Sequence, residues 1–589
     1  MPESPAQDLM KIETVTSTGW RVSLRRFWEL IADQRPLILL AFLALLLNSG
    51  LNLIAPFLIG YSIDHFILKK NYVGLFQMGG GLFGLYLIAL MAHYRQMIWM
   101  GTVGQEVLFR LRHRVFAKIQ ALPVAYFLRH QTGDLISRIN NDTDKLNQFL
   151  SESLVRFLGN LFIMLGAGVF VLILQPKLGF VALLPAGLLL IWTRAVSPWV
   201  KKTNALSLQK TGALSAEIQE SLNHFKEIVV FDRRDYFQER FQFHNQENYQ
   251  AALGAGYASS IFTPVYELVY HLAQLGVLGY GIWLLQKSEI TVGLLISFLT
   301  YVNRFYDPLR QIAMLWASFQ LALASWDRIA GVLDERSELP VLEKQPVQAN
   351  SACLAFHEVC FSYSEGPEVL HRVSFRLEAG KTYAFVGPTG GGKSTTAALM
   401  ARLYDPVSGQ VFFNGQDLRS LTAEERSQKI GFILQEPFLF EGTVAENLCI
   451  GNLELLKLSS AALLKKLEEM GMSPFLKRFE EGLETPVGGD QNQTSLGQKQ
   501  LLAFMRAVLR RPELLILDEA TANIDTVSEK LLEETLQKLP ATTTRVVIAH
   551  RLNTIESADQ IFFVNAGQIL PAGSLDAAVR LLMQQERQS

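Results

Sequence analysis

The stretch KTYAFVGPTGGGKSTT, residues 381–396, decides the fold of the second half of this chain. It runs from an apolar, strand-forming segment through a glycine-rich loop into a helix-forming segment, and the loop matches the pattern G-x-x-x-x-G-K-[ST]. In that pattern backbone N–H groups surround phosphate oxygens, and the start of the following helix adds a positive dipole end. The residues predicted to bind nucleotide phosphates are Gly387, Pro388, Thr389, Gly390, Gly391, Gly392, Lys393, Ser394 and Thr395.

A second apolar run, LLILDEAT at 514–521, places Asp518 at the end of a buried strand. A carboxylate in that position beside a phosphate loop suits Mg²⁺ coordination, together with the hydroxyl of Ser394. Glu519 follows directly and is placed to polarise an attacking water. These two segments predict an α/β P-loop ATPase domain that binds ATP and Mg²⁺.

Length and composition divide the chain into two parts. At 589 residues it is too long for one compact core, and its apolar runs are concentrated in residues 1–320. The formal net charge of −1 shows no basic excess of the kind that indicates nucleic-acid binding. The three cysteines, Cys353, Cys360 and Cys449, form no CxxC pattern, so neither a disulfide framework nor a zinc site is expected.

The first part is predicted to be a membrane α-helical bundle. A spanning helix needs about 20 mostly apolar residues. The polar first 20 residues exclude a signal peptide, and residues 21–36 are expected to form a short amphipathic helix at the cytoplasmic face. The six predicted spans are 36–60, 73–97, 152–175, 178–199, 260–285 and 290–313.

The loops between these spans predict the orientation. Residues 98–150 and 200–258 are long, carry most of the Lys and Arg of this part, and keep helical apolar periodicity. Positive charge marks the cytoplasmic side, so both termini are expected there, and the two segments are expected to extend the spanning helices into the cytoplasm.

Polar residues within the last two spans form two helical faces. One holds Glu267, His271 and Gln274, and the other holds Asn303, Asp307 and Arg310, each at i, i+4, i+7 spacing. Polar groups at membrane depth are costly and usually face a cavity or each other. Two interpretations stay open: the faces line a translocation pathway, or they make hydrogen bonds between helices and snorkel to the interface.

Further motifs then resemble one family, the ATP-binding cassette (ABC) transporters of the exporter type, over essentially the whole chain. GFILQEPFLF (431–440) is similar to the family's Q-loop, TSLGQ (494–498) stands in the place of its signature LSGGQ, ANID (522–525) matches its D-loop, and His550 matches its switch histidine. In the first half, 126–144 and 231–241 resemble the two intracellular loops of exporters.

The resemblance implies a type IV exporter fold: a transmembrane domain over 1–333, a linker over 334–351 and a nucleotide-binding domain over 352–589. It assigns catalytic roles to Glu519, His550 and Gln435, with Gln435 also near the metal. Tyr363 would stack on adenine, although a plain strand tyrosine is the alternative. The residues that would contact nucleotide across a dimer are Ser495, Gly497, Gln498 and Asp525.

The chain departs from the family pattern at the signature. Thr494 and Leu496 replace the usual leucine and glycine, and Gly489 and Asp490 stand where exporters commonly carry a glutamate. A half-transporter must dimerise, and in a homodimer both ATP sites would contain this altered signature. We therefore expect a second, homologous half-transporter as partner, the homodimer being the alternative.

The implied function is ATP-driven export of a hydrophobic or amphipathic substrate, drug-like or lipid, by alternating access. A lipid flippase, a peptide exporter and a regulatory or channel-like subunit are the alternatives on the same fold. The expected location is the inner membrane of a bacterial cell, in contact with membrane lipid, with the N-terminus and the nucleotide-binding domain in the cytoplasm.

Overall fold

The structure is a computed structural model that describes residues 32–335, 339, 341–344, 352–363, 366–452, 454–489, 494–518, 526–548, 558–573, 577 and 580. The chain divides into two compact units, Met1–Gln120 with Gly133–Glu335, and Ala121–Thr132 with Arg336–Ser589. The membrane-domain, linker and cassette boundaries expected from the sequence stay a prediction. The amphipathic helix expected over 21–36 lies almost entirely outside the described residues.

The first unit is helical. Its main helices are α2 (Arg35–Ser62), α3 (Tyr72–Gln120), α5 (Thr132–Ser137), α6 (Thr143–Gln148), α7 (Leu154–Leu174), α8 (Pro176–Asn223), α9 (Phe225–Val230), α10 (Arg234–Ser260), α11 (Phe262–Gln286) and α12 (Val292–Asp334). Short helical turns join some of them: η2 (Ala32–Gln34), η3 (Ile63–Ile67), η4 (Arg138–Asp142) and η5 (Phe149–Ser153). The helix α4 (Val124–Arg129) belongs to the second unit.

Five helical segments of the described chain are long and apolar enough to cross a membrane: Ala32–Ile67, Tyr72–Gln120, Thr132–Leu174, Pro176–Asn223 and Arg234–Gln286. They contain the first five predicted spans. The sixth predicted span lies at the start of α12, which is long enough but is not among the five. Asn303, Arg304, Asp307 and Arg310 lower the hydropathy of that stretch.

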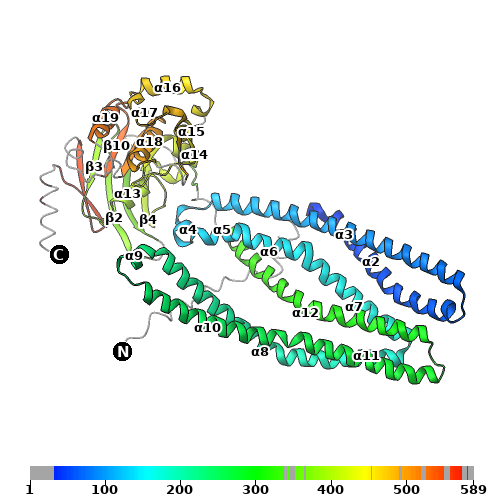
Figure 1. Ribbon diagram of the computed structural model, residues 1–589. Helices are drawn as coiled ribbons and strands as arrows, with labels where there is room; N and C mark the ends of the chain where they lie inside the picture. The colour runs from blue at the N-terminus through cyan, green and yellow to red at the C-terminus, as the bar shows by residue number, and fades with distance from the viewer. Residues whose placement is uncertain are drawn as a thin grey trace. The chain divides into compact units, whose positions relative to one another are not determined.

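The long positive segments are helical, as predicted. The helix α3 runs without a break from its apolar part to Gln120, and α8 runs to Asn223 and packs against α10. Figure 1 shows α2 and α3 as an antiparallel pair, with α8 and α10 side by side. These helices are therefore much longer than the ~20 residues that a bilayer core requires.

The two ends of this helical unit's sequence are joined by side chains. The π-helical turn η3, which follows α2, carries Asp64, whose carboxylate accepts hydrogen bonds from the Thr291 hydroxyl (2.5 Å) and the Gly293 N–H (2.8 Å) at the start of α12. Further along, the buried Tyr301 hydroxyl donates to the Leu53 carbonyl at 2.6 Å. These contacts hold α2 against α12.

The second unit is an α/β structure. A six-stranded sheet has the order β12-β11-β3-β10-β9-β6, in which the contacts from β11 to β6 are parallel, and a four-stranded antiparallel sheet has the order β2-β1-β4-β5. The small pair β7 (Gly442–Thr443) and β8 (Pro486–Val487) is separate. The strands of the two larger sheets are β1 (Leu354–Ser362), β2 (Glu368–Leu377), β3 (Thr382–Val386), β4 (Ser408–Phe413), β5 (Gln416–Asp417), β6 (Ile430–Ile433), β9 (Leu514–Asp518), β10 (Thr544–Ile548), β11 (Gln560–Asn565) and β12 (Gln568–Pro571).

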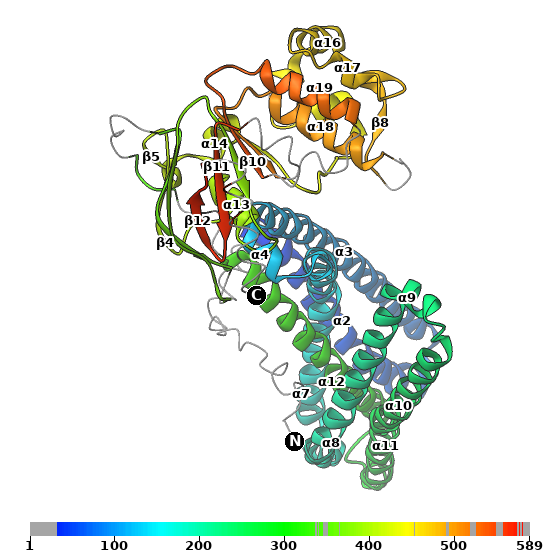
Figure 2. The same cartoon turned by 90° about the vertical axis from the view of Figure 1, so that its left-hand side faces the viewer.

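Helices complete this unit. They are α13 (Lys393–Met400), α14 (Ala423–Lys429), α15 (Val444–Cys449), α16 (Ser460–Glu469), α17 (Ser473–Leu476), α18 (Leu496–Val508) and α19 (Thr526–Gln537), with short turns η6 (Leu418–Ser420), η7 (Leu455–Lys457) and η8 (Gly482–Glu484). Figure 2 shows α16 to α19 gathered together, whereas α13 lies beside the strands β10 to β12. The strand β9 is buried at every residue, as expected for a central parallel strand.

Candidate functional site

The glycine-rich loop connects the buried strand β3 to α13 at the carboxyl edge of the parallel sheet. At Gly387 φ is +153°, and a Cβ added there would lie 1.9 Å from the Val564 carbonyl oxygen. At Gly392, where φ is +109°, a Cβ would lie 2.9 Å from Leu370. Only glycine fits at these two points, because backbone cannot give way as the tip of a side chain can. The loop is therefore a tight backbone cradle.

The charged and hydroxyl groups of the pattern lie at this loop. The Lys393 side chain is buried, and its Nζ donates to the carbonyls of Gly387 (2.8 Å) and Pro388 (2.9 Å). The Ser394 hydroxyl donates to the Asp518 carboxylate at 3.4 Å. The structure thus brings together a serine hydroxyl and a carboxylate that are 124 residues apart in sequence.

This arrangement fits a phosphate group with a bound divalent cation. No side chain caps the start of α13, so the backbone at that helix end faces the loop without a competing acceptor from its own N-cap. Hydroxyl and carboxylate oxygens are the ligands that Mg²⁺ prefers. Ser394 and Asp518 supply one of each.

The strand register places further predicted residues at the same edge. Ile548 of β10 pairs with both Asp518 and Phe385, and Ile433 of β6 pairs with Leu517. Gln435, which is exposed, follows β6 and so lies at the carboxyl edge of the sheet. Glu519, His550 and Asp525 lie outside the described residues, although Glu519 directly follows β9 and His550 comes two residues after β10.

Tyr363 lies next to the first turn of α13. Its hydroxyl is 3.0 Å from the Thr395 hydroxyl, its ring meets Phe361 and Tyr404 edge-on, and 38% of its surface is exposed. Burial raises the pKa of the neighbouring Tyr404, which keeps that phenol protonated. The contact with Thr395 has no signal in the sequence, because the two residues are far apart along the chain. The ring is thus held in place and partly open to a ligand.

The altered signature begins α18 with a reciprocal cap. The Ser495 hydroxyl accepts from the Gln498 N–H (3.2 Å), and the Gln498 side chain accepts from the Ser495 N–H (2.9 Å) and donates to the Arg478 carbonyl (2.7 Å). Leu496 is 44% exposed in the first helical turn. The spacing S-x-x-Q is the pattern of such a cap, which sequence reasoning missed. Thr494 and Gly497 are half-buried, and Asp490 lies outside the described residues.

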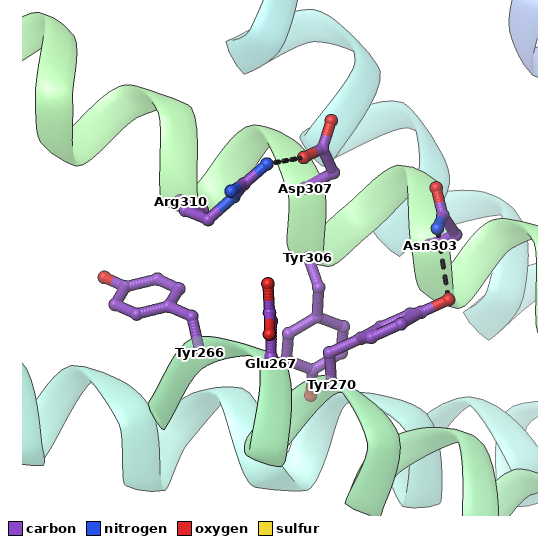
Figure 3. A pocket seen from close by; sticks show the side chains of 7 residues that line it. All are labelled: Tyr266, Glu267, Tyr270, Asn303, Tyr306, Asp307 and Arg310. Carbon is purple, nitrogen blue, oxygen red and sulfur yellow. Dashed lines mark hydrogen bonds and ion pairs between the residues drawn. The ribbon is translucent and has the colours of Figure 1, made fainter. Parts of the chain in front are cut away.

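A second candidate site is a cavity of about 180 Å³ between α11 and α12. It is lined by Tyr266, Glu267, Tyr270, Asn303, Tyr306, Asp307 and Arg310, which Figure 3 shows from close by. Four of the six polar residues predicted on the two faces are among them. His271 and Gln274 are not, because Gln274 is hydrogen-bonded to the Tyr270 hydroxyl (2.6 Å) and lies 3.4 Å from the His271 ring nitrogen.

Both earlier interpretations of these faces have support. Asn303 donates to the Tyr270 hydroxyl across the two helices at 3.1 Å, which is a contact between helices. The remaining polar groups border the cavity. Sequence reasoning missed the three tyrosines, because a tyrosine in an apolar span is indistinguishable from a packing residue without its neighbours.

Comparisons with known proteins agree with this geometry. The family model for the ABC transporter transmembrane region matches residues 38–309, and the model for the ABC transporter matches 370–522. The uncharacterised ABC transporter ATP-binding protein YfiC of Bacillus subtilis is 32% identical over 561 residues, which is 95% of this chain and 92% of that protein.

Two relatives have names that include a substrate. The fatty acid ABC transporter ATP-binding/permease protein of Mycobacterium bovis is 33% identical, covering 83% of this chain and 77% of its own length. The multidrug resistance ABC transporter ATP-binding and permease protein of Lactococcus lactis subsp. cremoris is 29% identical, covering 81% and 80%. The chain is therefore a multi-pass integral membrane protein that binds and hydrolyses ATP, and it belongs to the ABC transporter family as an exporter with its membrane region and its cassette in one polypeptide.

Proposed function

We propose that this chain is a half-transporter that pairs with a second half-transporter and exports a hydrophobic or amphipathic substrate by alternating access. The observation that carries the proposal is the phosphate loop, where Ser394 contacts Asp518 at the carboxyl edge of the sheet. A cassette that binds ATP between two subunits can drive two packings of the attached helices. The domains would be 1–333 for the membrane part, 334–351 for the linker and 352–589 for the cassette.

The residues would act as follows. The backbone of the loop from Gly387 to Gly392 would cradle the phosphates, and Lys393 would turn from the loop carbonyls to the β- and γ-phosphates. Ser394, Asp518 and Gln435 would hold Mg²⁺, which when bound would neutralise phosphate charge. Glu519 would orient the attacking water, His550 would contact the γ-phosphate, Tyr363 would stack on the base, and Asp525 would lie at the subunit boundary.

A heterodimer is favoured by the altered signature. Ser495, Gly497 and Gln498 would face the nucleotide bound by the partner, and Leu496 places an exposed side chain between Ser495 and Gly497. In a heterodimer the catalytic set of this chain would face the partner's signature, and the altered signature would serve the weaker site. The cassette and both termini would be cytoplasmic, and the membrane would be the bacterial inner membrane, in line with the positive charge of 98–150 and 200–258.

Substitution of the loop lysine tests the ATP-driven step. In inside-out membrane vesicles, Lys393→Ala should abolish ATP-dependent uptake of a transported compound, because the ammonium that contacts the phosphates is removed. Lys381→Ala is a matched control: this exposed lysine just before β3 contacts Glu378 and makes no contact with the loop. Undiminished uptake by Lys393→Ala would contradict the proposed role.

Expression of the chain alone tests the partner. A chain that requires a homologous half-transporter for stability, and then shows one fast and one slow ATP site, would support the heterodimer. A stable dimer of this chain with two equivalent, substrate-stimulated sites would overturn it. Screening drug-like molecules, lipids and peptides for stimulation of ATPase activity separates the export of drugs from lipid flipping and peptide export.

A further inference from the structure

We propose that the cavity between α11 and α12 binds the positively charged head of an amphipathic substrate, with Glu267 as its counter-ion. This inference rests on the proposed export function and names the substrate class. The charges around the cavity are unevenly matched: two lining residues are acidic, Glu267 and Asp307, and one is basic, Arg310.

The basic residue is already paired. Arg310 Nη2 lies 3.0 Å from Asp307 Oδ1, and the other oxygen of Asp307 accepts a hydrogen bond from Gln311 at 2.8 Å. Gln311 in turn accepts from Asn160 of α7 at 3.1 Å. Asp307 and Arg310 therefore neutralise each other within a fixed network, and they leave one formal negative charge at the cavity.

That remaining charge belongs to Glu267. Within the described part of the chain, Glu267 makes no hydrogen bond and no ion pair, and Figure 3 shows its carboxylate pointing from α11 toward α12. A carboxylate at membrane depth is costly unless it is compensated, so such residues usually serve a ligand or an ion. A bound cation would supply the compensation that the protein itself does not.

The walls of the cavity also suit a cation. Tyr266 and Tyr306 are buried, and the Tyr306 hydroxyl is held by the Ala182 carbonyl at 2.9 Å. Tyr270 is held by Asn303 and Gln274. Fixed tyrosine rings attract ammonium and other organic cations through their faces. An anionic head group, such as a carboxylate, would meet the Glu267 charge and no unpaired positive one.

The size and depth of the cavity indicate a head-group site. A volume of about 180 Å³ corresponds to roughly six water molecules, which is smaller than the pockets that enclose whole drug-sized ligands. At 1.5 Å of rise per residue, Glu267 lies roughly 28 Å from the Gln286 end of α11, and Asp307 lies roughly 22 Å from the Val292 end of α12. The cavity is thus far from the α11–α12 loop, and the apolar remainder of a substrate would extend along the helices.

A pair of ions with the same shape and opposite charge tests the proposal. We would measure equilibrium binding of tetraphenylphosphonium and of tetraphenylborate to the full-length protein in lipid nanodiscs, with empty nanodiscs subtracted. The expected result is saturable binding of the cation only. Glu267→Gln should lower the affinity for the cation by about tenfold, the size of one charge-assisted contact.

Two further variants sharpen the measurement. Glu289→Gln is the matched control, because Glu289 lies in the α11–α12 loop, pairs with Lys177 and does not line the cavity; its cation affinity should match wild type. Arg310→Gln leaves Asp307 without its ion pair and should increase the affinity for the cation. ATPase activity of each variant verifies that it is folded.

The outcomes separate this inference from the exporter function. Equal binding of both ions, or a Glu267→Gln variant with unchanged cation affinity, would overturn the cation site even if ATP drives export of another compound. Selective cation binding that depends on Glu267, without ATP-driven movement, would support the site and contradict the export function.

Discussion

Two helices of the nucleotide-binding unit begin in opposite ways. The helix α13 begins after Gly392, at a positive φ, with no side-chain cap, whereas α18 begins with a complete capping box between Ser495 and Gln498. The first therefore keeps its terminal backbone donors for a ligand. The second uses part of its own side chains to satisfy them, so the Ser495 hydroxyl must serve both the helix and any phosphate.

The surroundings of the two helix starts differ in the same direction. Gly387 and Gly392 are enclosed by Val564 and Leu370, and a side chain has no room there. Leu496, in contrast, is 44% exposed, so its side chain meets no steric obstacle within its own chain. This explains why the loop keeps every residue of its pattern while the signature can depart from it: the constraint on the signature comes from outside this chain.

The largest effect is expected at the catalytic carboxylate that follows β9. Glu519→Gln keeps the size of the side chain and removes the charge that orients water. ATP turnover should fall by ~100-fold or more, the scale of one general-base contribution, while ATP binding persists. Turnover and nucleotide binding measured on the same dimer check this, and normal turnover would sink the assignment.

Adding one methyl group to the loop should have the next largest effect. Gly387→Ala places a Cβ against the Val564 carbonyl, and overpacking of this kind costs about 1–3 kcal/mol. ATP affinity should fall roughly tenfold to a hundredfold. Gly482→Ala is the control: φ there is +60°, but nothing lies within 4 Å of an added Cβ, so its affinity should match wild type. Equal losses in both variants would show that the cradle is not the cause.

A cap substitution distinguishes the two tasks of Ser495. Loss of a helix N-cap costs about 1 kcal/mol, so both Ser495→Ala and Ser459→Ala, the cap of α16, should lower the melting temperature by roughly 2–4 °C. Only Ser495→Ala should also lower ATPase activity, by about tenfold, if its hydroxyl contacts a phosphate. A similar ATPase activity in both variants would reduce Ser495 to a structural cap.

The smallest effect is expected at the departure itself. Leu496→Gly restores the family pattern and removes an exposed side chain from the proposed phosphate contact. In dimers of this chain alone, ATPase activity should rise by roughly twofold to threefold, which is about 0.5 kcal/mol. No change in activity would mean that the leucine is tolerated, and the argument for a heterodimer would lose its main support.

Local features could be predicted from the sequence with good accuracy. The strand, loop and helix around 381–396 and the starts of the long helices follow from short-range apolar patterns and glycines. The cap of Ser495 was also readable from its spacing to Gln498. The sixth predicted span is helical, but Asn303, Asp307 and Arg310 make it too polar for an apolar-span criterion.

Features that depend on distant partners could not be predicted. Nothing in the sequence near Tyr363 indicates Thr395 as its neighbour, and the pairing of Asp307 with Arg310, which leaves Glu267 without a partner, needs side-chain positions. His271 and Gln274 share helical spacing with Glu267, yet they lie outside the cavity because Gln274 is engaged by Tyr270. Periodicity gives a face, and the neighbouring helix decides which part of that face is open.

The contacts between α2 and α12 have a consequence for biogenesis. Tyr301 and Leu53 are separated by 248 residues, and Asp64 and Gly293 by 229. At synthesis rates of about 5–20 residues per second, α2 would wait in the membrane for roughly 12–50 s before its partner helix is made. During that interval the Asp64 carboxylate lacks its final donors, so the earliest inserted helix is among the last to reach its native contacts, and a nascent chain released before α12 would expose this unfinished surface to quality control.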